Sequence, residues 1–237
     1  MSEKIKVNNQ SEGQSAIELA TYEQLTGWND RKYQIETSGE KFSVVILGED
    51  HYDTDMHEKQ IELITIIRPE YVLHEALKGW IYDPATEKFE KQQGRRFFNE
   101  GSPDAQMEES LTLNIDPVLA RASKDVGFKI VGCDLTGAET ISAEREIAQK
   151  YPDRFTYDEE IQLLEKNDDS DWISTPSQEM APFRDGKIVQ VILAYHGQGR
   201  KPLFTIVGAA HGRRIHDQEL LKGKVQGYAF VDQTEKR

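Results

Sequence analysis

The chain has 237 residues, of which 42 are acidic and 29 are basic, so its formal net charge at pH 7 is −13. A surface with that charge is a poor partner for nucleic acid or an anionic membrane, and we expect the protein to bind neither. The single cysteine excludes a disulfide framework within the chain, and the polar first residues lack the apolar segment of a signal peptide. These features predict a cytoplasmic protein.

The sequence predicts a polar tail followed by one folded domain. Residues 1–15 are rich in Ser, Asn and Gln and are predicted to be disordered. Residues 16–237 are predicted to form a single α/β domain, and a chain of this length can bury about 70% of its unfolded surface.

In chain order, the spacing of apolar residues predicts a helix over residues 16–27, a short strand over 32–37 and a buried strand over 42–48. A helix over 55–67 and a strand over 71–75 come next, and this strand–helix–strand order is a βαβ unit. The alternation continues with helices predicted over 116–126, 139–150, 157–166, 184–197 and 213–221, and strands over 129–133, 203–207 and 226–231. It indicates an α/β fold with a mainly parallel sheet and helices on both faces.

Residues 76–113 interrupt this alternation. They carry large aromatic residues among many charges, namely Trp80, Tyr82, Phe89, Phe97 and Phe98. A connection of this length inside a compact domain is usually functional or mobile. We expect a partly helical insertion over the carboxyl edge of the sheet, and an ordinary surface excursion is the alternative.

Two of the predicted strands end in the same way, with a glycine that is followed three residues later by a histidine. Gly48 and His51 end the first buried strand, and Gly208 and His211 end a later one. In a parallel sheet, ligands bind beyond the carboxyl ends of the strands. The two histidines are therefore predicted to meet in one site.

Acidic residues at other strand ends are candidates for the same site. His74 and Glu75 cannot point to the same face, because side chains alternate along a strand, and Glu75 lies nearer the open edge. Histidine nitrogens and carboxylate oxygens are common ligands of divalent Zn, Mn and Co. The predicted metal ligands are Glu49, His51, Glu75 and His211, and Asp50, His57 and Asp134 are predicted to line the site.

The same residues also fit functions that need no metal. Histidine titrates near neutrality, so His51 and His211, with Glu75, could act directly as general acid and base. A histidine after a strand can also be a capping or hydrogen-bonding residue, and His216 is interpreted as structural. Cys133 follows an apolar strand and is interpreted as a buried thiol rather than a nucleophile.

These motifs resemble those of the TraB-like proteins, a superfamily that includes the TIKI metalloproteases, the erythromycin esterases and the haem-binding ChaN proteins. Residues 47–51 with His57 resemble the first motif of the ChaN and erythromycin-esterase branches, and residues 192–211 resemble the closing motif of the TraB branch. The resemblance spans about residues 42–231 and leaves the branch open. It implies a ChaN-like or erythromycin-esterase-like α/β fold and a catalytic role for Arg145, within the helical segment 143–148.

The residues and the resemblance together predict a soluble hydrolase that depends on a divalent metal and acts on a small molecule or a peptide. Water is the predicted nucleophile, because the sequence offers no convincing Ser or Cys nucleophile. The resemblance gives Arg145 the role of stabilising the charge that develops on the substrate. The alternative is a non-catalytic protein that uses the same pocket to bind haem or a peptide, or a regulatory protein. The sequence predicts no oligomeric state.

Overall fold

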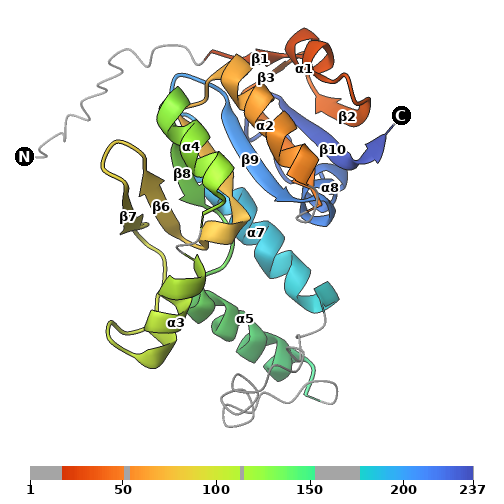
Figure 1. Cartoon of the computed structure of the whole chain (residues 1–237). Coiled ribbons are helices and arrows are strands. Elements are labelled where there is room, and N and C mark those ends of the chain that lie inside the picture. The colour runs from red at the N-terminus through yellow and green to blue at the C-terminus, as the bar shows by residue number, and fades with distance from the viewer. Residues whose placement is uncertain (1–17, 51–53, 113–114, 153–176, 237) are drawn as a thin grey trace, which may run out of the picture.

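The computed structural model describes residues 18–50, 54–112, 115–152 and 177–236, and its main feature is an eight-stranded sheet (Figure 1). The strand order is β2-β10-β4-β9-β5-β8-β6-β7. The strands are β2 (Tyr33–Ser38), β4 (Val44–Glu49), β5 (Tyr71–His74), β6 (Trp80–Asp83), β7 (Lys88–Lys91), β8 (Lys129–Gly132), β9 (Leu203–Gly208) and β10 (Tyr228–Lys236). A small separate sheet pairs β1 (Ala20–Thr21) with β3 (Lys41–Phe42).

The centre of the large sheet is parallel. β10, β4, β9, β5 and β8 run parallel to one another, whereas β2 at one edge and the β6–β7 hairpin at the other are antiparallel to their neighbours. The central strands are apolar on both faces because helices cover both faces, and β4 is buried along its whole length. The predicted fold class, an α/β fold with a mainly parallel sheet, is confirmed.

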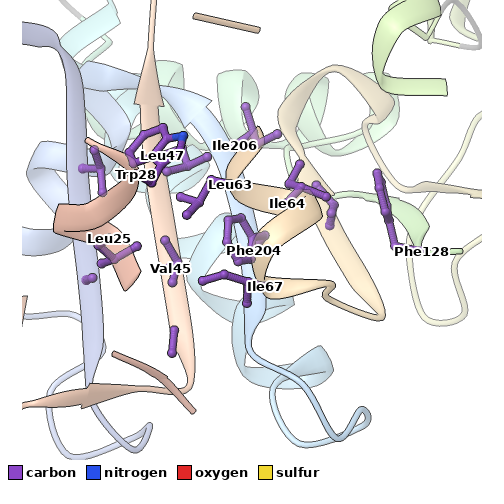
Figure 2. Close-up of a cluster of buried hydrophobic side chains, with 14 of the residues drawn as sticks. Leu25, Trp28, Val45, Leu47, Leu63, Ile64, Ile67, Phe128, Phe204 and Ile206 are labelled. Carbon is purple, nitrogen blue, oxygen red and sulfur yellow. The ribbon is translucent and has the colours of Figure 1, made fainter. Parts of the chain in front are cut away.

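Helices form two apolar cores, one on each face of the sheet, which we call the α2 core and the α7 core after the helix that each contains. α1 (Tyr22–Trp28), α2 (Thr54–Ile67) and α4 (Pro117–Val126) pack on one face, and α7 (Ser177–Tyr195) and α8 (Ala209–Asp217) pack on the other. In β4, Val45 and Leu47 point into the α2 core (Figure 2), and Val44 and Ile46 point into the α7 core. A side chain at a strand end therefore belongs to one face or to the other.

Capping residues explain where two of the helices begin and end. Asp116 accepts hydrogen bonds from two amides in the first turn of α4, at 2.7 and 3.1 Å, and Gly127 ends this helix in the left-handed conformation. Thr136 and Glu139 form a reciprocal capping box at the start of α5 (Gly137–Lys150). The predicted bounds of both helices are close to the observed ones because these signals are local.

Other helix bounds differ from the prediction. α8 begins at Ala209, directly after β9, so His211 lies in the first turn of a helix rather than in a loop. α7 begins earlier than predicted, at Ser177, although Pro182 lies inside it. α1 is shorter than the predicted helix, because Thr21 caps it. The tail predicted over residues 1–15 and the helix predicted over 157–166 lie outside the described residues.

The insertion over residues 76–113 contains a hairpin that the sequence did not predict. It follows a short 3-10 turn, η1 (Glu75–Leu77), and precedes the helix α3 (Pro103–Thr112). Since β6 pairs with β8, the hairpin extends the sheet sideways instead of lying over its carboxyl edge. Tyr82 and Phe89 contact each other across the hairpin, with ring centroids 5.2 Å apart, and belong to the α2 core.

Candidate functional site

Charged side chains gather where the parallel strands end, at the carboxyl edge of the sheet. β4 ends at Glu49, which is level with Gly208 at the end of β9. Glu75 follows β5 on the other side of β9, and His211 lies in the first turn of α8, directly beyond β9. This edge is the place where the sequence predicted a site.

His211 is held by two residues that the sequence analysis did not assign to the site. Its Nδ1 contacts Oδ1 of Asp185 in α7, and Arg214 donates hydrogen bonds to both carboxylate oxygens of Asp185, at 2.6 and 3.1 Å. His211 is 7% exposed and Asp185 is 3% exposed. The contact joins α7 to the start of α8 and fixes the orientation of the His211 ring.

The charge of Asp185 determines which nitrogen of His211 carries the proton. Burial raises the pKa of the Asp185 carboxyl, but the hydrogen bonds with His211 and Arg214 outweigh burial and hold this pKa below its usual value. An ionised carboxylate can only accept a hydrogen bond, so the contact with Asp185 requires the proton on Nδ1. Nη2 of Arg214 lies 2.9 Å from the same nitrogen and could donate to it only in the other tautomer. The contact with the charged Asp185 is the closer of the two, so we assign the proton to Nδ1. In the neutral ring, Nε2 then carries the lone pair and is the nitrogen that can take a proton or bind a ligand.

Glu75 lies beside the start of α8. Its Oε2 accepts a hydrogen bond from the amide of Gly208 at 3.0 Å, at the point where β9 passes into α8. Next along the sheet, Cys133 is a buried free thiol. Burial, together with the charges of Asp134 and Glu75, raises the pKa of this thiol well above its usual value. Cys133 is therefore protonated and is no nucleophile.

Arg184 of α7 connects the carboxylates of this edge. Its Nε donates a hydrogen bond to Asp134 at 2.9 Å. Burial lowers the pKa of the Arg184 guanidinium, but the hydrogen bond with Asp134 and the charges of Asp134, Glu75 and Asp185 raise this pKa above its usual value. Arg184 is therefore a fixed cation among three carboxylates.

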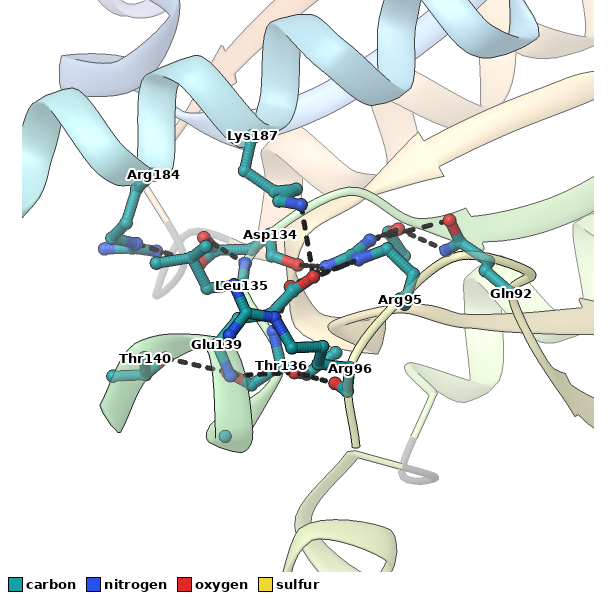
Figure 3. A network of polar contacts seen from close by, with 12 residues as sticks. Gln92, Arg95, Arg96, Asp134, Leu135, Thr136, Glu139, Thr140, Arg184 and Lys187 are labelled. Carbon is teal, nitrogen blue, oxygen red and sulfur yellow. Dashed lines mark hydrogen bonds and ion pairs between the residues drawn. The ribbon is translucent and has the colours of Figure 1, made fainter. Parts of the chain in front are cut away.

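A second network supports the loop that carries Asp134 (Figure 3). Arg95, from the segment after β7, donates hydrogen bonds to both carboxylate oxygens of Glu139, at 3.1 and 2.8 Å, and another to the backbone carbonyl of Asp134. Lys187 of α7 adds a hydrogen bond to Glu139 at 3.1 Å. Part of the insertion therefore contacts the carboxyl edge, where it braces this loop.

Glu49 lies on the other face of the sheet, toward α2. Gln60 of α2 donates a hydrogen bond to its carboxylate at 2.6 Å, and Nε2 of His57 lies 3.9 Å from the same oxygen. Nδ1 of His57 lies 3.5 Å from a carboxylate oxygen of Asp116. The sequence placed Glu49 with Glu75, but alternation along β4 directs Glu49 to the face of Leu47.

Three of the four predicted metal ligands are described, and they do not form a compact ligand set. Among the residues that the structure describes, the group of three or more ligand residues whose ligand atoms all lie within 4.8 Å of one another consists of Glu36, His216 and Asp217, away from this edge. Glu49 and Glu75 are instead engaged separately, by Gln60 and by the amide of Gly208. The described residues at the carboxyl edge therefore do not present a ready-made set of metal ligands.

The remaining predicted residues have different locations. His51 lies outside the described residues. Asp50 is exposed, directly after β4. Arg145 is exposed on α5, whereas the arginine that contacts the strand-end carboxylate Asp134 is Arg184. The role that the resemblance gave to Arg145 stays a prediction.

The helix pattern of α7 contained a signal for Asp185. This residue lies three and seven positions before Ile188 and Ile192, both of which are fully buried, so it occupies the apolar stripe of the helix. A carboxylate on a buried stripe needs a partner, because an unpaired charge is costly to bury. The sequence does not indicate that this partner is His211, because the pairing depends on how α7 packs against α8.

Comparison with known proteins gives little further guidance. No family model matches the chain, and no curated protein matches it. Among solved structures, the chain resembles ChaN of Campylobacter jejuni, a protein that shows cofacial haem binding. Sequence identity is 14%, the match covers 80% of this chain and 88% of that chain, and the TM-score is 0.38. In the part of the chain that is described, no helix has the length and apolar character needed to cross a bilayer.

Proposed function

We propose that the carboxyl edge is a hydrolytic site in which His211 acts as general base on a water molecule. The observation that supports this proposal is the contact between Asp185 and His211. A buried, ionised carboxylate behind Nδ1 leaves Nε2 as the basic nitrogen. The substrate is a small molecule or a peptide whose scissile group reaches this edge.

Neighbouring groups take the other roles in this proposal. Asp185 stabilises the imidazolium that forms when Nε2 accepts a proton from water, and Arg214 holds the Asp185 carboxylate in position. In this proposal Arg184 of α7 is the cation that stabilises negative charge on the substrate, because its side chain lies at this edge and is 36% exposed. Water is the nucleophile, since Cys133 is buried and protonated.

A screen of chromogenic esters and short peptides tests the proposal. We expect turnover by the wild-type chain that falls about 10²- to 10⁴-fold in His211→Gln and in Asp185→Asn, because both remove the general base or its orientation. Chelator treatment should leave the rate unchanged. The matched control is His196→Gln, which changes a histidine directly after α7 and should retain wild-type turnover. Turnover by His211→Gln equal to wild type would contradict the proposal.

The same contact favours one second function, which is haem binding without catalysis. A histidine that ligates a metal usually donates its other ring N–H to a carboxylate, and Asp185 is in position to accept from His211. In that case haem iron would bind Nε2 of His211. A Soret shift on titration with haem that is lost in His211→Gln, without turnover of any ester or peptide, would favour haem binding over hydrolysis.

A further inference from the structure

Three potential metal ligands lie together outside the candidate site, where the last turn of α8 meets the edge strand β2. Nε2 of His216 is 2.8 Å from Oε2 of Glu36, and one ligand atom each from Glu36, His216 and Asp217 lie within 4.8 Å of one another. Asp217 ends α8 and is exposed, so the group opens to solvent. The hydrolytic proposal does not use any of these residues.

Two of the three ligands are held in fixed positions. The ring of His216 stacks on Phe230, with centroids 5.9 Å apart, and meets Tyr228 edge-on at 5.7 Å. The carboxylate of Glu36 accepts a hydrogen bond from Gln34 at 2.6 Å on its other oxygen. Ligands that are already oriented by packing and by an outer hydrogen bond are what a metal site requires.

Only one nitrogen of His216 is available to a ligand. Nδ1 is buried and has no hydrogen-bond partner among the described residues, whereas Nε2 faces the Glu36 carboxylate. Tetrahedral Zn²⁺ with bonds of about 2.0–2.1 Å separates neighbouring ligand atoms by roughly 3.3 Å. The contact between His216 and Glu36 would therefore open only slightly to admit the ion.

We propose that Glu36, His216 and Asp217 bind a divalent transition metal of the Zn²⁺ type, with water in the remaining position. An imidazole ligand favours Zn²⁺ over Mg²⁺ and Ca²⁺, which prefer oxygen ligands. The two carboxylates balance the charge of the ion. Because Glu36 is on β2 and the other ligands are on α8, the metal cross-links the edge of the sheet to the helix and stabilises the folded chain by linkage.

Calorimetric titration of the full chain with Zn²⁺ tests this site. Glu36→Gln, His216→Gln and Asp217→Asn should each weaken Zn²⁺ binding by about tenfold or more. The control is His57→Gln, because His57 also lies beside carboxylates, those of Glu49 and Asp116, and this variant should keep the wild-type affinity. Zn²⁺ should raise the Tm of the wild type and of His57→Gln but not that of Glu36→Gln, and Mg²⁺ should have no such effect.

Several outcomes would overturn the proposal of a metal site at Glu36, His216 and Asp217. One is the absence of Zn²⁺ binding to the wild-type chain, and another is equal affinity in the wild type, Glu36→Gln and Asp217→Asn. Loss of binding in His57→Gln with binding kept in His216→Gln would place the ion at the carboxyl edge instead. If His216→Gln does not fold, the two carboxylate variants decide, because neither of those side chains is buried.

Discussion

His211 is the residue whose proposed chemistry depends most on a single neighbour. Replacing Asp185 by Asn removes the carboxylate that fixes the proton on Nδ1, and the new amide can donate a hydrogen bond to that nitrogen. We therefore expect ¹⁵N NMR to show the Nδ1–H tautomer of His211 in the wild type and a shift toward Nε2–H in Asp185→Asn. Asp232→Asn, which changes a buried carboxylate within β10, should leave the tautomer unchanged. The same tautomer in Asp185→Asn and wild type would refute this account of the ring.

The stability of the fold should depend less on His211 than on the core beside it. The side chain of His211 is buried, so its removal has some cost. Arg214 still satisfies Asp185 in His211→Ala, and we expect a loss of about 1 kcal/mol in the free energy of unfolding. Ile206→Ala leaves a cavity in the core and should cost about 2–5 kcal/mol. Equal losses in urea unfolding would mean that His211 is a structural residue.

At the scale of elements, the sequence predicted the parts whose signals are local. The central strands are continuous apolar runs, and capped helices such as α4 and α5 begin at recognisable residues. The β6–β7 hairpin carried no such signal, because its strands are short and β7 is half exposed. Glu75 and His211 were predicted from their places after strands, whereas Asp185 and Arg184 come from a helix whose partner depends on tertiary packing.

Two helical glycines give a prediction about how closely the helices pack. A Cβ at Gly212 in α8 would lie 2.5 Å from Cε2 of Phe230, whereas a Cβ at Gly186 in α7 would meet nothing within 4 Å. Gly212→Ala should therefore lower the free energy of unfolding by about 1–3 kcal/mol through overpacking. Gly186→Ala should raise it by up to about 1 kcal/mol through helix propensity. Urea denaturation measures both, and a stabilising Gly212→Ala would show that α8 does not approach the sheet this closely.

The whole molecule is tied together at the carboxyl edge by buried carboxylates that join distant segments. Glu139 receives hydrogen bonds from the insertion through Arg95 and from α7 through Lys187, and Asp185 joins α7 to α8. Burial raises the pKa of both carboxyls, but their hydrogen bonds outweigh burial and hold both pKa values below the usual range. Glu108 of α3 behaves in the opposite way, because burial raises its pKa above the usual value. The three residues make the stability of the fold depend on acidity.

The signs of these shifts predict that acid destabilises the protein. A carboxyl whose folded-state pKa is lowered contributes stability that is complete above its unfolded pKa, about 4 for Asp and Glu, and that is lost as the pH falls through its folded pKa. Burial also lowers the pKa of His196. The contribution of His196 to the free energy of unfolding therefore also declines as the pH falls, starting from about pH 6.5. The raised pKa of Glu108 opposes this trend, since its contribution is present in acid and is lost as the pH rises.

Urea midpoints measured between about pH 7 and about pH 3 test this balance. The wild type should lose stability toward low pH, most steeply below about pH 4.5. In that range the carboxyls whose folded-state pKa is lowered begin to take up protons in the unfolded chain. Asp185→Asn should flatten the profile, because it removes one of the groups that protonates on unfolding. Glu108→Gln should steepen it, because it removes the group that opposes the loss. A profile of Asp185→Asn parallel to that of the wild type would mean that the Asp185 pair does not contribute to the acid sensitivity of the fold.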